Sequence, residues 1–294
     1  MKALCFGSLN IDYTYQVDHF VSRGETLLSG GLQVFSGGKG LNQSIALSRA
    51  GVETFHAGSI GEDGRFLLRQ LQEAGVDTAC VTVRDDVRTG HAIIQNGGDG
   101  DNCILLYGGA NQSITRQQVD EVLSRFEAGD VLVLQNEVNE LDYIMERAHE
   151  RGLRIALNPS PMDEKILALP LDMVDWLILN EVEAEQLMGC DVTDGAAAAA
   201  QLHEKFPRTA IVLTMGKQGS YYADGETTLH QNAFPVQAVD TTAAGDTYTG
   251  YFLAGILENR PVQEAMALAA KAAAISVTRP GAAPSIPERE EVTL

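Results

Sequence analysis

The chain has 294 residues, of which 45% are hydrophobic and 21% charged, and its formal net charge at pH 7 is -19. This composition supports a folded chain with a sizeable core. The excess of acids argues against a nucleic-acid backbone or an anionic membrane as the main partner, since both attract a basic surface. It still allows an anionic small substrate, because one helix N-terminus or local basic group can override distant charge.

The cysteines and the first residues of the chain set an expectation for the compartment. The four cysteines show neither CxxC spacing nor another metal-binding pattern, which favours reduced thiols. The opening MKALCFGSLN lacks the long apolar segment and cleavage site of a signal peptide, and no stretch is apolar enough to span a bilayer. We therefore expect a cytoplasmic protein without a membrane partner.

The first part of the chain predicts short strands and two helices. Apolar strands at 3–7 and 54–60 alternate with helical patterns at 41–51 and 65–75. Each helical pattern ends at a glycine, which is a common helix stop. This alternation is the beginning of an α/β body.

Two regions break this pattern. Residues 12–35 hold β-prone stretches interrupted by glycines, and residues 79–107 read as three short strands. GGDGDN at 97–102, between HAIIQN and CILLY, is a strong hairpin signal. Because these strands do not fit a parallel layer, they predict a small separate β-sheet inserted into the body.

From residue 115 onward, strands and helices alternate regularly. Apolar strands are predicted at 131–135, 154–158, 176–180 and 210–216, with helical segments between them. Continuous apolar strands separated by amphipathic helices indicate a parallel sheet covered on both faces. We expect one domain over residues 1–294, with lid strands inserted at about 12–35 and 79–107.

The segment DTTAAGDTYTG, residues 240–250, leads from a small polar turn into an apolar helix. The first N–H groups of a helix are unpaired and carry partial positive charge, and small residues let a ligand approach them. The segment therefore suits an anion such as a phosphoryl group. Asp246 lies just inside the predicted helix, where a dipole-stabilising acid and a catalytic group are about equally supported.

Two further polar segments follow or precede predicted elements. SGGKGLNQ at 36–43 is neither a Walker A loop nor a dinucleotide fingerprint, but Lys39 and Asn42 favour a hydroxylated ligand. Asn10 and Asp12 follow the first strand, where they can bind sugar hydroxyls. Taken alone, an Asx-type turn is the simpler reading for this pair.

NEVEAE at 180–185 follows another apolar strand. Asn180 can cap the next helix with Glu183 at the capping-box position, and a Mg²⁺-linked role for Glu183 is the sharper alternative. Glu137 ends a strand, where a lone acid is usually solvated. The candidate site positions all fall at or near the carboxyl ends of strands or the starts of helices, which share one edge of a parallel sheet. These positions are Asn10, Asp12, the 37–42 turn, Glu137, Asn180, Glu183, Gly216 and Asp246. The sequence therefore predicts a single site at this edge.

GGKGLNQSIALSRAG and DTTAAGDTYTG resemble the two signatures of the ribokinase-like (PfkB) family of sugar kinases. GGANQSIT, LNPSP, NEVEAEQLMG and TMGKQG follow in the family's order, so the resemblance covers essentially the whole chain. It implies a Rossmann-like three-layer α/β/α fold with a small β-sheet lid that often forms a dimer interface. It also implies ATP as phosphoryl donor, Mg²⁺, and an activating K⁺.

The resemblance assigns roles to residues. Asp246 matches the general base, and the backbone N–H groups of Ala243, Ala244 and Gly245 match an anion hole for the γ-phosphoryl group. The sugar-contacting positions match Asn10, Asp12, Gly38, Lys39, Asn42 and Glu137. The ATP-binding positions match Asn180, Thr214, Gly216, Gly219 and Gly245, with Glu183 helping to organise Mg²⁺ indirectly. The monovalent-cation positions match Asp240, Thr242, Ser276, Arg279, Gly281 and Ser285.

The resemblance implies phosphorylation of the primary 5-hydroxyl of D-ribose. A related kinase for deoxyribose, a ketohexose or a nucleoside is the alternative, and a non-catalytic sugar sensor is disfavoured because Gly245 and Asp246 are both present. The chain departs from the family at Tyr248, Thr249 and Tyr251, which we interpret as packing changes. Ala270 replaces a histidine expected near the adenine, which leaves nucleotide preference open.

Overall fold

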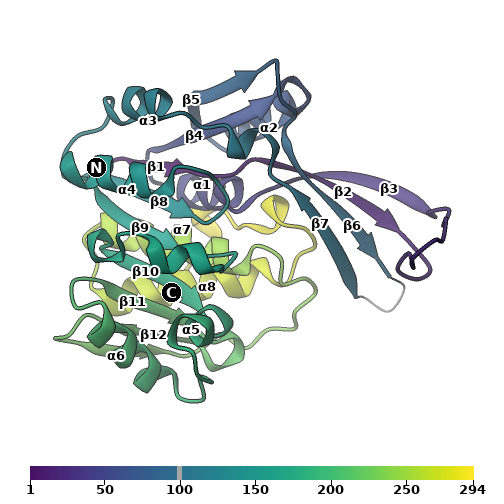
Figure 1. Cartoon of the computed structure of the whole chain (residues 1–294). Coiled ribbons are helices and arrows are strands. Elements are labelled where there is room, and N and C mark those ends of the chain that lie inside the picture. Colours follow the sequence, from purple (N-terminus) through teal and green to yellow (C-terminus); the bar gives the residue numbers. More distant parts are fainter. Residues whose placement is uncertain (98–100) are drawn as a thin grey trace.

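The computed structural model describes residues 1–97 and 101–294, which form a layered body with a small sheet projecting from it (Figure 1). The central sheet has the strand order β13-β12-β11-β10-β9-β8-β1-β4-β5. Its strands are β1 (Ala3–Phe6), β4 (Thr54–Gly61), β5 (Asp77–Arg84), β8 (Val131–Gln135), β9 (Arg154–Asn158), β10 (Trp176–Asn180), β11 (Ala210–Thr214), β12 (Ser220–Ala223) and β13 (Thr228–Gln231). Pairing is parallel from β5 to β11, and β12 and β13 are antiparallel additions. The predicted, mostly parallel sheet is confirmed.

Helices cover both faces of this sheet. One apolar cluster lies under α1 (Lys39–Arg49), α2 (Arg65–Glu73), α7 (Ala244–Leu257) and α8 (Val262–Ser276). The other lies under α3 (Arg116–Leu123), α4 (Leu141–Glu150), α5 (Glu181–Met188) and α6 (Gly195–Lys205). In β1, Ala3 and Cys5 join the first cluster and Leu4 and Phe6 the second, so alternate side chains are buried on opposite faces. None of the helices in the described ranges is both long enough and apolar enough to cross a membrane.

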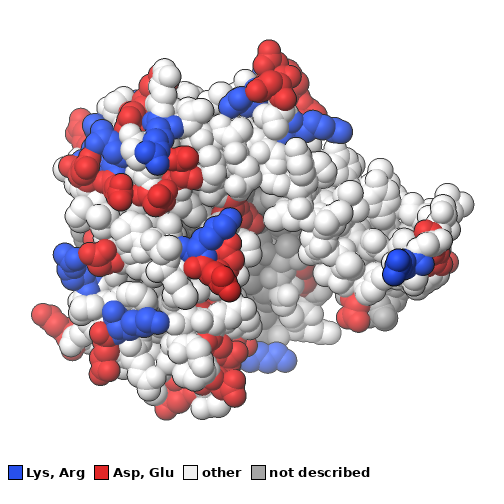
Figure 2. Space-filling model, viewed as in Figure 1, with Lys and Arg blue, Asp and Glu red and all other residues white. Residues whose placement is uncertain are grey.

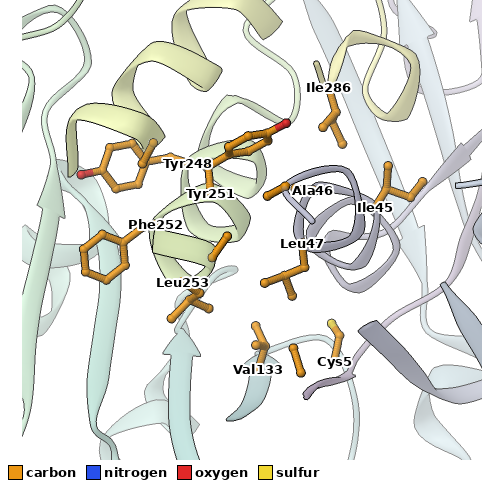
Figure 3. Packing of buried hydrophobic residues seen from close by; sticks show 14 of the residues in the cluster. Cys5, Ile45, Ala46, Leu47, Val133, Tyr248, Tyr251, Phe252, Leu253 and Ile286 are labelled. Carbon is orange, nitrogen blue, oxygen red and sulfur yellow. The ribbon is translucent and has the colours of Figure 1, made fainter. Parts of the chain in front are cut away.

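Helices α1 and α7 approach each other closely in the first cluster (Figure 3). A Cβ on Gly250 would lie 2.4 Å from the Cβ of Ala46, so this contact requires glycine. Two small residues therefore allow the helices to meet. One turn before them stand Asn42 on α1 and Asp246 on α7, which the same contact brings within hydrogen-bonding distance.

The projecting sheet, called the lid below, has the strand order β3-β2-β6-β7 (Figure 1). Its strands are β2 (Asn10–Gln16), β3 (Gly31–Gly37), β6 (Gly90–Asn96) and β7 (Asn102–Tyr107). β2 pairs antiparallel with β3 and parallel with β6, and β6 pairs antiparallel with β7. The predicted hairpin is thereby confirmed, while residues 98–100 of its turn lie outside the described residues.

One strand that the sequence places in the lid belongs to the body instead. β5 begins the predicted lid region 79–107, but it pairs parallel with β4 and forms the edge of the central sheet. Parallel neighbours need a crossover connection, and α2 provides it. Val81 and Val83 pack against the first apolar cluster, which fixes the strand on the body. The second of the two lid segments therefore starts with β6 at Gly90, not at residue 79.

Candidate active site

A cleft of about 200 Å³ lies at the carboxyl ends of the central strands. Its lining residues are Lys39, Asn158, Ile178, Leu179, Asn180, Glu183, Thr214, Thr241, Ala243, Ala244, Gly245, Asp246 and Thr249. Figure 2 shows that the surface is hollowed between the body and the lid. The cleft lies at the edge of the sheet where the sequence predicts the site, and ligands of open α/β sheets bind at this edge.

The start of α7 forms one wall of the cleft. Ala243 precedes the helix with a φ of 60°, a left-handed conformation that costs a non-glycine residue roughly 1–2 kcal/mol. A Cβ on Gly245 would meet nothing within 4 Å, so this helix start faces open space. The Ala244 N–H donates to the Thr241 carbonyl at 3.2 Å. An anion at this helix start would therefore have to replace that bond in order to use the Ala244 N–H.

Asp246 lies in the first turn of α7 and is only 6% exposed. Its two carboxylate oxygens each accept an amide N–H from α1. The Asn42 Nδ2 donates to Oδ2 at 3.0 Å, and the Gln43 Nε2 donates to Oδ1 at 2.9 Å. Because amide N–H groups only donate, they orient the carboxylate and leave its other lone pairs as acceptors.

The Asn42 side chain also carries an acceptor without a partner. Its Oδ1 is buried and has no hydrogen-bond partner among residues 1–97 and 101–294. An unpaired buried acceptor costs about 1–3 kcal/mol. A ligand hydroxyl would satisfy this atom, so the geometry fits the predicted sugar contact.

Lys39 and Glu137 meet at the start of α1. The Lys39 backbone N–H donates to Glu137 Oε2 at 3.0 Å, and the Ser8 hydroxyl donates to the same oxygen. Burial raises the pKa of Glu137. Burial lowers the pKa of the Lys39 ammonium, but the charges of nearby carboxylates, Asp246 first among them, outweigh burial and leave it above the ordinary value. Lys39 is therefore a cation held among acids.

Asn10 and Asp12 begin the first lid strand. Asn10 Oδ1 accepts from Asn111 Nδ2 at 2.7 Å, which fixes the orientation of the Asn10 amide. Burial, helped by the charge of Glu137, raises the pKa of Asp12 to about 6. A Cβ on Gly37 would lie 2.1 Å from Asp12 Oδ2, so glycine makes room for this carboxylate. We call Asn10, Asp12, Lys39, Asn42 and Glu137 the lid end of the site.

Asn180 and Glu183 form a capping box at the start of α5. Asn180 Oδ1 accepts from the Glu183 N–H at 2.9 Å, and Glu183 Oε2 accepts from the Asn180 N–H at 3.0 Å. The structural reading of this pair is confirmed, and both residues also line the cleft. With Thr214 and residues 243–245 they form what we call the helix-start end of the site. Gly216 and Gly219 shape the turn after Thr214 with φ values of 51° and 91°.

The predicted cation positions lie around Asp240. Its Oδ1 accepts from the Thr242 N–H at 2.9 Å and hydroxyl at 2.6 Å, and its Oδ2 accepts from the Gly281 N–H at 2.8 Å. Burial raises the pKa of Asp240, but these bonds outweigh it and hold the value below the usual range. The remaining side chains bond elsewhere: Ser276 to Ala273 O, Ser285 to Ala282 O, and Arg279 to Glu291. Thus Asp240, Thr242 and Gly281 are brought together, while the other three contribute no side chain to this cluster.

The family departures are mainly packing residues. The Tyr248 hydroxyl donates to Ser220 Oγ at 2.8 Å, and the Tyr251 hydroxyl donates to Pro287 O at 2.7 Å. Ala270 on α8 is 8% exposed and joins the first apolar cluster. Thr249 differs from expectation because it lines the cleft as well as being buried.

Sequence reasoning missed several residues that support the site. The sequence carries a signal that could have identified Gln43, because the spacing of Lys39, Asn42 and Gln43 puts all three on one face of a helix. Gln135 ends the apolar run VLVLQ as its only polar side chain, which is a weaker signal. Asn111 carries no local signal of its contact with Asn10, because the two residues are distant in sequence.

Metal-binding side chains do not gather into a centre of their own. Across residues 1–97 and 101–294, no group of three or more His, Cys, Asp or Glu side chains is arranged to hold a metal ion.

Comparisons with known proteins identify the family of the chain. The pfkB family of carbohydrate kinases matches residues 1–289. The ribokinase of Staphylococcus aureus is 35% identical over 302 residues, which cover 99% of this chain and 98% of that protein. The ribokinase of Cryptococcus neoformans in complex with ADP has a TM-score of 0.87 at 33% identity, covering 99% of this chain and 98% of that one. The ribokinase of Arabidopsis thaliana complexed with ribose and ATP has a TM-score of 0.88 at 28% identity, covering 99% and 97%. The chain belongs to the pfkB family of carbohydrate kinases.

Proposed function

We propose that this protein transfers the γ-phosphoryl group of ATP to the primary 5-hydroxyl of D-ribose, producing ribose 5-phosphate and ADP. The observation that carries the proposal is Asp246, which is held by amides of α1 beside the open start of α7. An acid in this position can accept a hydroxyl proton next to a bound phosphoryl group. Relatives named ribokinase, one of them in complex with ribose and ATP, support the choice of substrates.

The lid end binds the sugar in this proposal. Asn42 Oδ1 is a buried acceptor without a partner among the described residues, and Asp12 and Glu137 supply further acceptors for hydroxyl groups. Asn10 is oriented by Asn111 so that its Oδ1 is already used. Its Nδ2 is then the group that donates to a sugar oxygen.

Phosphoryl transfer occurs between the lid end and the helix-start end. The sugar hydroxyl gives its proton to Asp246 as its oxygen bonds to the γ-phosphorus, and the bond from that phosphorus to the bridging oxygen breaks as ADP leaves. In this proposal the N–H groups at the start of α7 and the Lys39 ammonium stabilise the negative charge on the transferred group, and the cleft lined by Lys39 and residues 243–245 supports this role. Positioning and charge stabilisation supply most of the catalysis in such reactions.

Mg²⁺ bound with ATP would neutralise charge on the phosphates. Glu183 lines the cleft and is 6% exposed, and one of its oxygens already accepts the Asn180 N–H. This arrangement fits an indirect role for Glu183, in which a water molecule separates it from the ion. Asn180 and Thr214 bind ATP in the same proposal.

A K⁺ site beside the start of α7 fits the chemistry around Asp240. The Asp240 carboxylate binds the 240–242 turn to Gly281, so both segments meet at one point. Backbone carbonyls of these segments are the type of ligand a monovalent cation takes. K⁺ would supply a positive charge that orders the loop before α7, and replacing K⁺ with Na⁺ is expected to lower the rate.

A second copy of this chain is the proposed partner of the lid. Residues Ile104, Leu105, Leu106 and Tyr107 of β7 are each at least 50% exposed. Neighbouring strand residues point to opposite faces, so both faces are apolar at this edge. Figure 2 shows few charged residues on the visible face of the lid.

The free thiols of all four cysteines suit the cytoplasm, where we place the enzyme.

A coupled assay of ADP release tests the function. Ribose, 2-deoxyribose, a ketohexose and a nucleoside are compared with ATP as donor, each with K⁺ and with Na⁺. The highest kcat/KM on ribose is expected, and a higher value on another sugar would contradict the ribose assignment. GTP in place of ATP measures the nucleotide preference that Ala270 leaves open.

The base role of Asp246 has its own test. Asp246→Asn keeps the shape of the side chain but removes the proton acceptor. We expect kcat to fall by about 10²–10⁴-fold. A variant with wild-type turnover would show that another group accepts the proton.

A further inference from the structure

A chain of buried amides leads from the central sheet to Asp246. The Gln135 Nε2, at the end of β8, donates to Gln43 Oε1 at 2.7 Å. The Gln43 Nε2, on α1, donates in turn to Asp246 Oδ1 on α7 at 2.9 Å. Both glutamines are 0% exposed. Neither side chain can therefore touch sugar or ATP without a rearrangement of the core.

The direction of this chain follows from the carboxylate. An ionised carboxylate only accepts hydrogen bonds, so Gln43 must present its Nε2 to Asp246. Its Oε1 then faces Gln135, which must also present its Nε2. Primary amides do not titrate in the physiological range, so the chain orients Asp246 without exchanging a proton with it.

The amide of Gln135 has a second contact that fits this direction. Its Nε2 also approaches Cys5 Sγ at 3.5 Å, and the Cys5 thiol donates to Gly40 O at 3.4 Å. Burial raises the pKa of Cys5 to about 11, so the thiol keeps its proton and remains a donor. The supporting groups therefore stay neutral at pH values where a kinase is assayed.

The Gln135 side chain lowers the stability of the fold in a way that an apolar residue at the same position would not. Gln135 Oε1 is buried without a hydrogen-bond partner among the described residues. A Cβ on Gly7 would lie 2.2 Å from that oxygen, so the fold also reserves space for it. A buried unpaired acceptor lowers stability. Support of Asp246 explains the two glutamines better than core stability does.

We propose that Gln43 is a positioning residue for phosphoryl transfer, with Gln135 fixing the orientation of its amide. Gln43 holds the Asp246 carboxylate in the conformation that faces the sugar hydroxyl. The inference rests on the proposed role of Asp246 as the base. Asn42 differs from Gln43, because its own Oδ1 is left for the ligand.

The first test is Gln43→Met, which keeps a similar shape and removes the donor. We expect kcat to fall by about 10- to 100-fold, because a hydrogen bond to a charged group is lost. KM for ribose and ATP is expected to stay within about twofold of wild type, since no substrate contact is removed. Ser48→Ala is the matched control on the same helix, where the hydroxyl donates to Ala74 O at 2.7 Å, and it should keep kcat. Wild-type kcat in Gln43→Met would overturn the inference.

A double-mutant cycle separates support of Asp246 from a general effect on the fold. In the Asp246→Asn background, Gln43→Met is expected to change the residual rate by less than about twofold. A full additional loss in the double variant would show that Gln43 acts independently of Asp246. Asp246→Asn with wild-type turnover would reject the base role and this inference together. A slow Asp246→Asn with a fully active Gln43→Met would reject this inference alone.

Gln43→Glu provides a second route if Gln43→Met does not fold. It places another carboxyl group against Asp246, and two such neighbours share a proton. The pH at which kcat falls to half its maximum is then expected to be higher than in wild type. An unchanged pH profile in a folded Gln43→Glu variant would contradict contact between these groups.

Discussion

The lid end and the helix-start end of the site are built from different chemical groups: mainly side chains at the first and mainly backbone N–H groups at the second. At the lid end, hydrogen bonds already hold the polar groups before any ligand arrives: Asn111 donates to Asn10, Asn42 donates to Asp246, and Glu137 accepts from the Lys39 backbone N–H. At the helix-start end, backbone groups at the start of α7 face open space. The first arrangement fixes the positions of the binding groups when the protein folds, but it leaves some buried polar atoms without a partner. In the second arrangement, the interactions of the binding groups are completed only when the ligand binds.

The largest effect is expected at the helix-start end. Gly245→Ala places a methyl group in the open space where the phosphoryl group would approach the α7 N–H groups. We expect kcat to fall by about 100-fold, similar to the loss of one anion-hole donor. Stability should hold or rise by about 0.5–1 kcal/mol, because alanine suits a helix better than glycine. Steady-state kinetics and the thermal unfolding midpoint measure the two effects, and unchanged kcat would place the phosphoryl group elsewhere.

The next effect concerns the helix contact behind the lid end. Gly250→Ala forces α1 and α7 apart at Ala46, so we expect a loss of about 1–3 kcal/mol in unfolding free energy. Because the same contact brings Asn42 to Asp246, kcat should also fall by roughly tenfold. Gly255→Ala is the matched control, since its Cβ would lie 2.7 Å from Ala265 Cβ on α8 rather than against α1.

Gly255→Ala should therefore lose stability while keeping kcat near wild type. Equal losses of kcat in the two variants, measured at a temperature where both are folded, would mean that the α1–α7 contact has no special relation to catalysis. Chemical denaturation measures the unfolding free energy of each variant, and assays at saturating substrate measure kcat.

A pH titration distinguishes binding from chemistry at the lid end. Asp12 has a pKa of about 6 because of burial and the nearby Glu137 charge. As the pH falls through this value, Asp12 takes up a proton and loses acceptor capacity. We expect KM for ribose to be constant above this pH and to rise by up to about tenfold per unit below it. KM measured from pH 5 to 8 tests this, and Asp12→Asn should flatten the curve around a higher KM.

The smallest effect is expected at the capping box. Asn180→Ala removes the side-chain acceptor for the Glu183 N–H, so unfolding free energy should fall by about 1 kcal/mol. KM for ATP should rise a few-fold while KM for ribose stays constant, because only the helix-start end is changed. An increase confined to KM for ribose would reverse the assignment of the two ends.

Local signals predicted much of the fold and part of the site. Asp246 was placed at a helix start by the small polar turn before it, and α7 does begin at Ala244. The parallel sheet followed from uninterrupted apolar strands such as VLVLQ, all of whose residues are buried. The capping box of Asn180 and Glu183 was visible from their spacing alone.

Features that depend on tertiary contact were not predicted. β5 mixes exposed and partly buried residues with one buried residue, Cys80, and such a mixed pattern does not separate a lid strand from a sheet edge, so its place in the body required the fold. The role of Gln43 depends on the close α1–α7 contact, which joins residues about 200 positions apart. The bond from Ala244 N–H to Thr241 O depends on the turn conformation set by the φ of Ala243.

Only residues 7–9 separate β1 of the body from β2 of the lid, and all three are buried. Ser8 donates to Glu137, and both backbone groups of Leu9 bond to Asn111. A swing of the whole lid about this junction would break those bonds, whereas bending farther along the strands would leave them intact. The junction therefore resists a hinge motion of the lid right next to the side chains proposed to bind the sugar.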